Sequence, residues 1–302
     1  MNKIVNCINC NAKEFKPFAN VPDRHYGIKG NFTLDKCKNC GLVFLNPMPT
    51  EQELTAFYPQ ESYYAYHIDI FKKNPIKDFF KKLFLMDNSV KEPKFNKPGK
   101  ILDIGCGNGW VLYQFKLKGW EVYGVEPSKI GSEIGNKAGL NIFNGELLSA
   151  SFDNLKFDYV RSNHSFEHIH NPNEIINEIH RILKTNGKLL IGIPNINGIN
   201  AKIFNKYWYY LGAPVHTFNY CEKTITEILN KNGFKIEKIS YNSNWSGVLG
   251  SIQIYLNRKN QKISHDGFLV NFMPLRFLFN VIAKTQNLFK VGDCIEIIAV
   301  KK

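Results

Sequence analysis

The sequence lacks the features that mark secreted, membrane-spanning and disordered proteins. It begins MNKIVNCINC, which contains no apolar run of the kind that forms a secretory signal. No window approaches about 18 uncharged apolar residues, so we expect no transmembrane helix. Prolines number only 13 and aromatic residues make up 14% of the chain, which excludes a wholly disordered or collagen-like protein. We therefore expect a cytoplasmic protein whose 302 residues bury one sizeable core, with room for a small module.

The net charge of +13 is unevenly distributed along the chain. Residues 66–100 and 256–302 carry +5 each, whereas residues 1–65 carry +1 and residues 101–255 carry +2. The two basic segments are also rich in Phe, Leu and Ile, so they fit contact with a membrane surface or a partner as well as they fit solvated lysines. A nucleic-acid enzyme would more often carry its positive charge around the catalytic domain, so nucleic acid is not the partner we expect.

Four of the seven cysteines form two close pairs, Cys7-x2-Cys10 and Cys37-x2-Cys40. In a chain without a secretory signal, such pairs indicate a metal site rather than disulfides. Four thiolates suit tetrahedral Zn²⁺, and a site closed by four protein ligands has a structural role. Gly41 follows the last of them and lets the backbone turn under the metal. We therefore predict a zinc ribbon over residues 1–45.

Residues 46–99 are predicted to form a helical, Tyr-rich and basic connector. Thr50 and Glu53 have the spacing of a capping box, which predicts a short helix after residue 50. Residues 70–86 have the pattern of a basic amphipathic helix, and a Pro- and Lys-rich linker follows. Between the two predicted helices lies a cluster of tyrosines, namely Tyr63, Tyr64 and Tyr66.

At residue 100 the pattern changes to that of an α/β sheet. An apolar strand over 101–104 precedes a glycine turn, a helix over 110–118 and a second strand over 120–125, which ends at Glu126. This unit is typical of one half of a nucleotide-binding sheet. The acid at the end of the second strand can accept hydrogen bonds from both hydroxyls of a ribose. The turn can approach a ligand closely because it contains Gly105, Gly107 and Gly109.

The glycine turn reads DxGxGxG, with Trp110 where the last glycine of the dinucleotide fingerprint GxGxxG would stand. Asp103 would repel a pyrophosphate but attract a sulfonium and an ammonium group. The stretch resembles motif I of class I S-adenosylmethionine (SAM)-dependent methyltransferases. The resemblance implies an α/β fold over residues 100–302, with a Rossmann-like seven-stranded sheet, helices on both faces and SAM as cofactor.

Later segments match the rest of such a domain. The remaining strands are predicted over 140–143, 157–162, 188–195, 233–242 and 294–300. Helices are predicted over 128–138 and 172–184, the latter ended by Asn186-Gly187, with an amphipathic insertion at about 256–290.

The family resemblance also implies a set of cofactor-binding residues. Glu146 would contact the adenine amine, and Asn163 and His164 follow the fourth strand, at the edge where open α/β sheets bind ligands. The full set is Asp103, Gly105, Cys106, Gly107, Gly109, Glu126, Pro127, Glu146, Asn163 and His164.

A closer resemblance is to a bacterial subgroup that carries a zinc ribbon before the methyltransferase core. Its motifs appear here as CKNCGLVFLNPMPT, Pro194-Asn195, an aromatic loop ending at His216, and TITEILNKNGF. Such proteins resemble enzymes of surface-polysaccharide and modified-sugar pathways. Related nucleotide-sugar C-methyltransferases are longer than this chain, which favours O-methylation. Val215 stands where the subgroup commonly has Arg, so no basic group is present there to bind a phosphate or carboxylate.

Methyl transfer to a sugar hydroxyl requires an aligned nucleophile and a general base. The resemblance makes His216 the first candidate base, although it could merely hydrogen-bond a loop. Glu167 and His168 are the second candidates, although such a pair could only orient its loop. The candidate substrate contacts are Asn195, Trp208, Tyr209, Tyr63 and Tyr64. The aromatic rings among them could stack on a sugar or belong to the core.

We expect a SAM-dependent methyltransferase acting on a small molecule, most simply a hydroxyl of a sugar, nucleotide-sugar or glycan precursor. One alternative is an RNA methyltransferase with the ribbon as RNA-binding module, although the ribbon segment lacks a basic stripe. Another is a lipid- or quinone-type methyltransferase, in which residues 267–289 dock peripherally on the inner membrane face instead of packing against residues 70–86. A non-catalytic binding protein is disfavoured because Asp103, the three glycines and Glu126 are all present.

Overall fold

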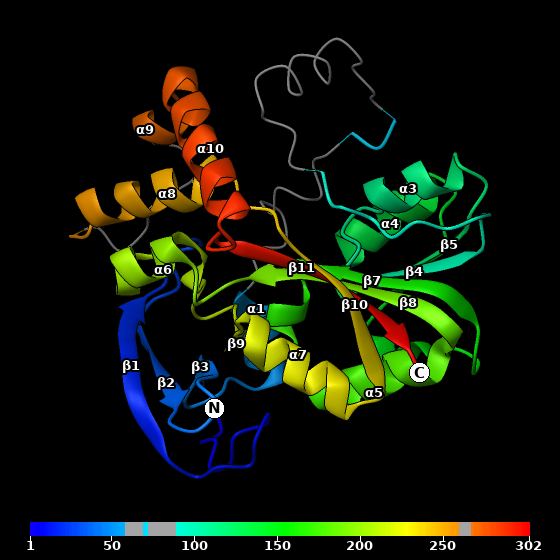
Figure 1. Ribbon diagram of the computed structural model, residues 1–302, viewed down its shortest axis with the longest axis horizontal. Coiled ribbons are helices and arrows are strands. Elements are labelled where there is room, and N and C mark those ends of the chain that lie inside the picture. The colour runs from blue at the N-terminus through cyan, green and yellow to red at the C-terminus, as the bar shows by residue number, and fades with distance from the viewer. Residues whose placement is uncertain (58–68, 72–88, 260–266) are drawn as a thin grey trace.

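The computed structural model describes residues 1–57, 69–71, 89–259 and 267–302. A seven-stranded sheet crosses the middle of the molecule (Figure 1). Its strands are β4 (Lys100–Ile104), β5 (Glu121–Glu126), β6 (Ile142–Asn144), β7 (Phe157–Asn163), β8 (Leu183–Pro194), β10 (Phe234–Tyr241) and β11 (Cys294–Lys301). Tyr63, Tyr64 and nearly all of the helix predicted at 70–86 lie outside the described residues.

The strand order of this sheet is β10-β11-β8-β7-β4-β5-β6. Strands β4 to β8 pair in parallel, and β11 is antiparallel to both of its neighbours. The order reverses between β4 and β7, so the crevice outside their carboxyl ends is where this topology binds a ligand. The predicted seven-stranded sheet is confirmed.

Helices cover both faces of the sheet (Figure 1). On one face lie α3 (Trp110–Lys116) and α4 (Lys129–Lys137), and on the other lie α5 (Pro172–Ile182) and α7 (Glu222–Lys231). Helix α5 buries isoleucines at helical spacing, which gives it an apolar stripe against the sheet. It ends at Ile182 rather than at residue 184 as predicted, because Leu183 already pairs with Phe157 and begins β8.

The N-terminal segment forms a second, antiparallel sheet of order β1-β2-β3-β9. It consists of β1 (Phe15–Pro22), β2 (Asn31–Cys37), β3 (Val43–Leu45) and β9 (Phe218–Asn219). The last strand comes from the part of the chain that forms the larger sheet, and its Phe218 pairs with Phe44 of β3. Side chains of the ribbon, the large sheet, α5 and α7 belong to one hydrophobic core, in which Leu34, Ile191 and Ile176 are each fully buried. The predicted ribbon is thus joined to the larger domain by both backbone pairing and packing.

Short helices complete the fold. After the ribbon, α1 (Glu51–Phe57) begins with the predicted capping box, in which Thr50 Oγ1 accepts from the Glu53 amide and Glu53 accepts from the Thr50 amide. Helix α6 (Ile199–Phe204) follows β8, and 3-10 turns cover Leu147–Ala150, Phe166–His168, Asn205–Tyr207 and Tyr209–Leu211.

The insertion between β10 and β11 contains the helices α8 (Trp245–Leu256), α9 (Phe268–Asn271) and α10 (Met273–Leu288). The insertion begins at α8, before the predicted residue 256. The sequence did not reveal α8, because this helix is apolar almost all round and lacks the amphipathic pattern that marked the rest of the insertion. Large apolar side chains of the last two helices are exposed, among them Phe268, Met273 and Leu288. No helix among the described residues is long and apolar enough to cross a membrane.

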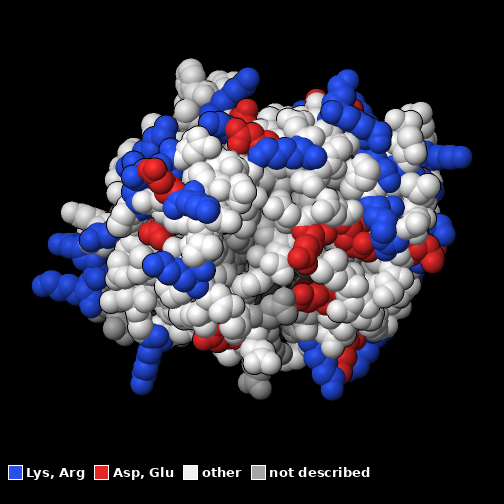
Figure 2. Space-filling model, turned by 90° about the horizontal axis from the view of Figure 1, so that it is seen from below, with Lys and Arg blue, Asp and Glu red and all other residues white. Residues whose placement is uncertain are grey.

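Charged side chains on one face of the molecule are interspersed (Figure 2). Lys and Arg lie mostly towards the edges of this view, and uncharged atoms cover its hollowed middle. Asp and Glu gather beside the hollow. Despite the net charge of +13, the described residues therefore form no continuous basic stripe on this face.

Candidate active site and metal centre

The glycine turn joins the carboxyl end of β4 to the start of α3. Gly105, Gly107 and Gly109 all have positive φ angles, of 70°, 57° and 79°. A Cβ on Gly105 would lie 2.5 Å from the Cβ of Ser165, and one on Gly109 would lie 2.4 Å from a methyl group of Leu140. The turn therefore needs glycine both for its backbone conformation and for its packing.

Glu126 holds this turn from the end of β5. Its side chain is 7% exposed, and its two carboxylate oxygens accept hydrogen bonds from the amides of Gly107, at 2.8 Å, and Ser128, at 2.9 Å. Each carboxylate oxygen can accept more than one hydrogen bond, so the residue can anchor the loop and still receive hydroxyl groups. This geometry fits the ribose-binding role predicted for Glu126, which stays a prediction.

Asp103 lies in a buried ion pair with Arg161, a residue that the sequence alone did not single out. The Arg161 Nη1 to Asp103 Oδ2 distance is 2.6 Å, and Arg161 Nε lies 3.5 Å from Glu92. Burial opposes the charge of Arg161, but the two carboxylates raise its pKa further above its usual value. Two acids thus surround one guanidinium, so this buried cluster carries a net negative charge, and its member Asp103 lies two residues before Gly105. The signal in the sequence was a single arginine at an inner position of the predicted strand FDYVRSN.

The other predicted cofactor residues lie around the same edge of the sheet. Cys106 is in the turn, and burial raises the pKa of its thiol. Exposed Pro127 follows β5, and exposed Glu146 follows β6. Asn163 ends β7, and His164 comes next with a positive φ of 53°, its amide donating to the carbonyl of Gly192. The structure brings these residues to the carboxyl ends of four neighbouring strands, and their contacts with SAM stay predictions.

Glu167, His168 and His216 converge in space, although His216 is distant in the sequence. Each residue contributes one atom that could bind a metal, a carboxylate oxygen of the glutamate or a ring nitrogen of a histidine. These three atoms all lie within 4.8 Å of one another. The imidazoles of His168 and His216 meet edge to face, with ring centroids 4.6 Å apart. Glu167 and His168 follow β7 in the loop whose Ser165 packs on Gly105, so this cluster, the Glu167–His168–His216 triad, lies next to the glycine turn.

Backbone carbonyls orient both imidazoles of the triad. His168 Nδ1 lies 3.0 Å from the carbonyl oxygen of Val215, and His216 Nδ1 lies 3.0 Å from that of Tyr210. Because a carbonyl only accepts, each Nδ1 is the protonated nitrogen and each Nε2 carries the lone pair.

The charges in the triad follow from burial and from mutual contacts. Burial and the neighbouring His168 lower the pKa of His216 to about 3, and burial lowers the pKa of His168. Burial alone would raise the pKa of Glu167, but the contact with His164 and the nearby imidazoles lower it to about 2. At neutral pH the triad therefore holds two neutral imidazoles and one carboxylate.

The predicted acceptor contacts are less well placed for a ligand. Trp208 is 2% exposed and donates its indole N–H to Asp293, which favours the core role over stacking on a sugar. Asn195 is buried, with its amide donating to the carbonyl of Gly292. Half-buried Tyr209 packs edge to face on His25. Tyr63 and Tyr64 lie outside the residues described.

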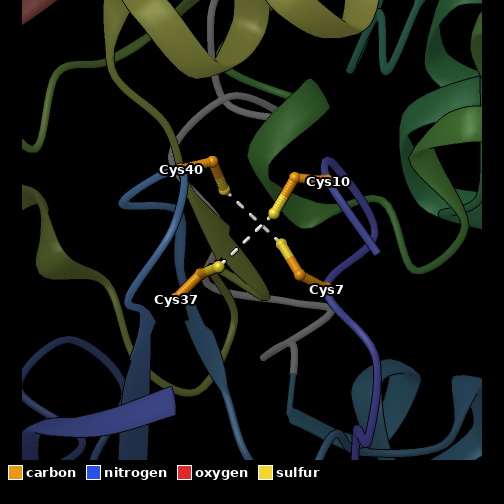
Figure 3. A group of neighbouring side chains, drawn as sticks. All are labelled: Cys7, Cys10, Cys37 and Cys40. Carbon is orange, nitrogen blue, oxygen red and sulfur yellow. Dashed lines mark hydrogen bonds between the residues drawn. The ribbon is translucent and has the colours of Figure 1, made fainter. Parts of the chain in front are cut away.

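The four paired cysteines point toward one another (Figure 3). Their sulfur atoms all lie within 4.8 Å of one another, and the Cys7–Cys40 and Cys10–Cys37 pairs are each 3.5 Å apart. A tetrahedral ion with Zn–S bonds of about 2.3 Å separates its sulfur ligands by about 3.8 Å. The donor set and its spacing therefore fit a zinc ion.

The two cysteine turns have the same backbone structure. The amide of Cys7 donates to Ala12 and that of Asn11 to Cys7, and the Cys37 turn repeats this pattern with Leu42 and Gly41. Asn11 and Gly41 occupy equivalent positions with positive φ angles of 58° and 85°. The predicted role of Gly41 in the turn is confirmed, and β3 follows it as expected.

The ribbon reaches the triad through one threonine. Thr217 follows His216 and precedes β9, and its carbonyl accepts from the amide of Leu45. The Thr217 amide donates to the carbonyl of Glu167 at 2.9 Å, and its hydroxyl donates to the carbonyls of Glu167 and Ile169. Thr217, directly before the strand that completes the ribbon sheet, therefore links the loop that carries Glu167 and His168 to the residue that follows His216.

Comparisons with known proteins agree with this geometry. A family model described as a methyltransferase domain matches residues 70–239, more than half of the chain. An uncharacterized protein of Methanocaldococcus jannaschii is 30% identical over 142 residues, which cover 45% of this chain and 65% of that protein. The ubiquinone biosynthesis O-methyltransferase of Pelagibacter ubique is 29% identical over 147 residues, which cover 46% and 57%. The chain thus spans less than two thirds of the length of these curated relatives.

The fold also matches a solved structure. A SAM-dependent methyltransferase from Archaeoglobus fulgidus superposes with a TM-score of 0.51 at 21% identity, covering 80% of this chain and 100% of that one. This likeness shows the fold. Together with the matching family model, the strand order and the glycine turn, it establishes that the chain belongs to the SAM-dependent methyltransferases.

Proposed function

We propose that this protein transfers the methyl group of SAM to a hydroxyl oxygen of a small-molecule acceptor, a sugar or glycan precursor. The observation that carries the proposal is the adjacency of the glycine turn to the Glu167–His168–His216 triad, through the contact between Gly105 and Ser165. One side of the crevice offers groups suited to SAM, and the other offers polar groups suited to an acceptor.

The proposed cofactor site consists of groups that this fold brings to one edge. Glu126 would accept from the ribose hydroxyls, and exposed Glu146 would accept from the adenine amine. The carboxylates of Asp103 and Glu92 exceed the charge of Arg161, which favours the positively charged methionine part of SAM.

In the transfer, the acceptor oxygen forms a bond to the methyl carbon while the bond from that carbon to sulfur breaks. The electron pair of the broken bond stays on sulfur, and the hydroxyl proton must leave. In a site without a cation, His216 Nε2 is the predicted proton acceptor, because its Nδ1 is held by the Tyr210 carbonyl. The low pKa of His216 keeps this nitrogen unprotonated but makes it a weak base.

Two features favour a small acceptor over RNA. The ribbon segment, residues 1–45, carries seven basic and three acidic side chains, and the three acids of residues 46–65 reduce the net charge of residues 1–65 to +1. The face in Figure 2 has dispersed basic side chains, whereas RNA-binding surfaces carry a continuous basic patch. The sugar class rests on the motifs shared with the subgroup that carries a zinc ribbon.

A lipid- or quinone-type acceptor is the second candidate. The exposed apolar side chains of α9, α10 and the residue that follows favour it, because such a surface suits contact with a membrane. Relatives of this chain include the ubiquinone biosynthesis enzyme and a demethylmenaquinone methyltransferase from Geobacillus. This candidate predicts sedimentation with anionic vesicles, lost when Phe268 and Leu288 are changed to Ser.

We further propose that the four-cysteine site holds a structural Zn²⁺. All four positions of a tetrahedral ion would be filled by thiolates, which leaves none for a substrate. The ion would stabilise the ribbon and, through β9, the position of His216.

The test is incubation of the purified protein with methyl-labelled SAM and three fractions of its own host: soluble nucleotide-sugars, membrane glycolipids and quinones, and total RNA. We expect label in the nucleotide-sugar or glycolipid fraction, and its loss in His216→Ala. The matched control is His180→Ala, because His180 is a half-buried histidine that packs on Phe234, outside the triad.

Label in quinones would support the second candidate instead. Label in RNA would overturn the small-molecule proposal. Equal transfer by His216→Ala and the wild type would overturn the placement of the acceptor beside the triad.

A further inference from the structure

We infer that Glu167, His168 and His216 form a second metal site, which binds a divalent first-row transition-metal cation at the acceptor side of the crevice. The site is separate from the four cysteines and differs from them in ligand chemistry. Its catalytic consequence rests on the proposed function, but its ability to bind a cation does not.

The ligand atoms are already close to the spacing that one ion requires. They come from the loop after β7 and from the residue before Thr217, and all lie within 4.8 Å of one another. Two ligands that are each about 2.1 Å from an ion lie at most about 4.2 Å apart, so the atoms need to approach by no more than about 0.6 Å. Small side-chain rotations achieve this.

The surroundings of the two histidines are those of metal ligands. A histidine that binds a metal through one ring nitrogen almost always donates its other N–H to a carbonyl or carboxylate. His168 and His216 each donate from Nδ1 to a backbone carbonyl at 3.0 Å. These bonds fix the tautomer in which Nε2 carries the lone pair.

Glu167 provides an independent indication of a ligand. Its side chain is 2% exposed, yet its Oε2 atom has no hydrogen-bond partner in the part of the chain that the structure describes. Its other oxygen, Oε1, lies 3.5 Å from His164 Nδ1. A buried carboxylate oxygen without a partner is costly, and a cation between the carboxylate and the two imidazoles would remove that cost.

The donor set also indicates the class of cation. Two imidazoles and one carboxylate suit Zn²⁺, Fe²⁺, Co²⁺ or Mn²⁺, and without a thiolate they do not favour soft ions such as Cu⁺. Three protein ligands leave coordination positions open, as in catalytic metal sites and unlike the closed four-cysteine site.

An open position beside the glycine turn gives the site a role in the proposed transfer. A cation there would polarise the acceptor hydroxyl and lower the pKa of that hydroxyl. The hydroxyl proton would pass to solvent water as the carbon–oxygen bond forms and the carbon–sulfur bond breaks. The weak base His216 would then act as a ligand that positions the acceptor, and no protein base would be required.

The test measures Co²⁺ binding to the full-length protein loaded with Zn²⁺ at the cysteines, by isothermal titration calorimetry and absorption, without SAM or acceptor. We expect one Co²⁺ per chain beyond the zinc, without the thiolate-to-cobalt absorption that exchange into the cysteine site would produce. His216→Ala and Glu167→Gln should weaken binding about 100-fold or more, since loss of a supporting contact alone costs 10- to 100-fold. His180→Ala should bind like the wild type.

Each variant is checked for its melting temperature and its SAM affinity, so that misfolding is recognised. If Glu167→Gln does not fold, His216→Ala decides the question. Absence of Co²⁺ binding, or binding that is unchanged in a folded His216→Ala variant, would overturn the site. Because this test measures binding, its failure would leave the proposed methyl transfer standing. Conversely, a protein that binds Co²⁺ but transfers no label to any host fraction would contradict the proposed transfer and leave the metal site standing.

Discussion

At the scale of the residue, Glu126 holds the glycine turn through the amide of Gly107, and Arg161 holds Asp103 in a buried ion pair. The three glycines and Glu126 were predictable because their spacing follows from the conformation of the turn. Arg161 and Thr217 were not, because their roles depend on partners that are close only in the fold. Arg161 binds an acid 58 residues away, and Thr217 binds a carbonyl 50 residues away.

Gly105→Ala should weaken SAM binding by at least about tenfold, or about 1.4 kcal/mol. The new methyl group would lie 2.5 Å from Ser165 Cβ, so either the turn or the loop of the triad must move. Gly119→Ala is the matched control: its φ is 83°, but the nearest atom to its Cβ is 3.6 Å away in Pro98, remote from the turn. Calorimetric titration with SAM compares them, and equal affinities would contradict the account of the turn.

Arg161→Met should lower the free energy of unfolding by about 3–5 kcal/mol, because it leaves Asp103 buried beside Glu92 without their cation. Chemical denaturation measures the loss. Adding Asp103→Asn should recover part of it by removing one of the stranded charges. If the free energy of unfolding of Arg161→Met alone lay within about 1 kcal/mol of the wild-type value, the ion pair of Arg161 with Asp103 would contribute little to stability.

At the scale of the element, the ribbon and the methyltransferase domain share a sheet. The cysteine spacing predicted the metal site and the turn at Gly41. It could not predict that β9, only two residues long and far along the chain, pairs with β3 through Phe44 and Phe218 and so completes the ribbon sheet. So short a strand carries no periodic pattern of its own, and its pairing depends on the packing of the whole fold.

Removal of the proposed zinc ion with a chelator should loosen β9 and the residues that precede it. The amides of residues 216–219 should exchange hydrogen faster, because the pairing of Phe44 with Phe218 depends on the ribbon. SAM affinity should change less, since Gly107 is held by Glu126 and not by the ribbon. Hydrogen exchange measures the effect, and readdition of Zn²⁺ is the control. Unchanged protection of β9 in the zinc-free protein would contradict the proposed link.

Asp158 joins three strands of the large sheet and gives stability a pH dependence. It accepts from the Lys100 amide at 2.7 Å and from Lys184 Nζ at 2.8 Å, and although burial opposes them, these contacts lower the pKa of Asp158. A lowered pKa means that the stabilisation is present above the usual Asp value of about 3.9 and is lost as the pH falls through the folded-state pKa.

Asp158→Asn should therefore cost about 1 kcal/mol at pH 7, and the difference from the wild type should shrink as the pH falls below about 3.9. Asp153→Asn is the control, since the Asp153 side chain is 88% exposed. Denaturation at several pH values measures both variants. A constant difference at all pH values would contradict the assignment.

At the scale of the whole molecule, the fold was predictable because seven strands and their helices recur with regular spacing. The boundaries of the helices were harder to predict. Helix α5 ends where Leu183 pairs with Phe157 in the sheet, and α8 lacks an amphipathic pattern. The acceptor depends on the shape and chemistry of the crevice, which comes from loops distant in the sequence. The triad illustrates this, because only folding brings His216 to Glu167 and His168.

The central claim is that the glycine turn and Glu126 hold SAM at the carboxyl edge of the sheet. Its most direct test is calorimetric titration of the wild type, Glu126→Gln and Glu121→Gln with SAM. Glu121 lies on the same strand but is exposed, with its side chain 52% accessible. The account predicts binding by the wild type and Glu121→Gln, and at least about tenfold weaker binding by Glu126→Gln. Absence of SAM binding in the wild type, or equal affinity in all three proteins, would contradict it.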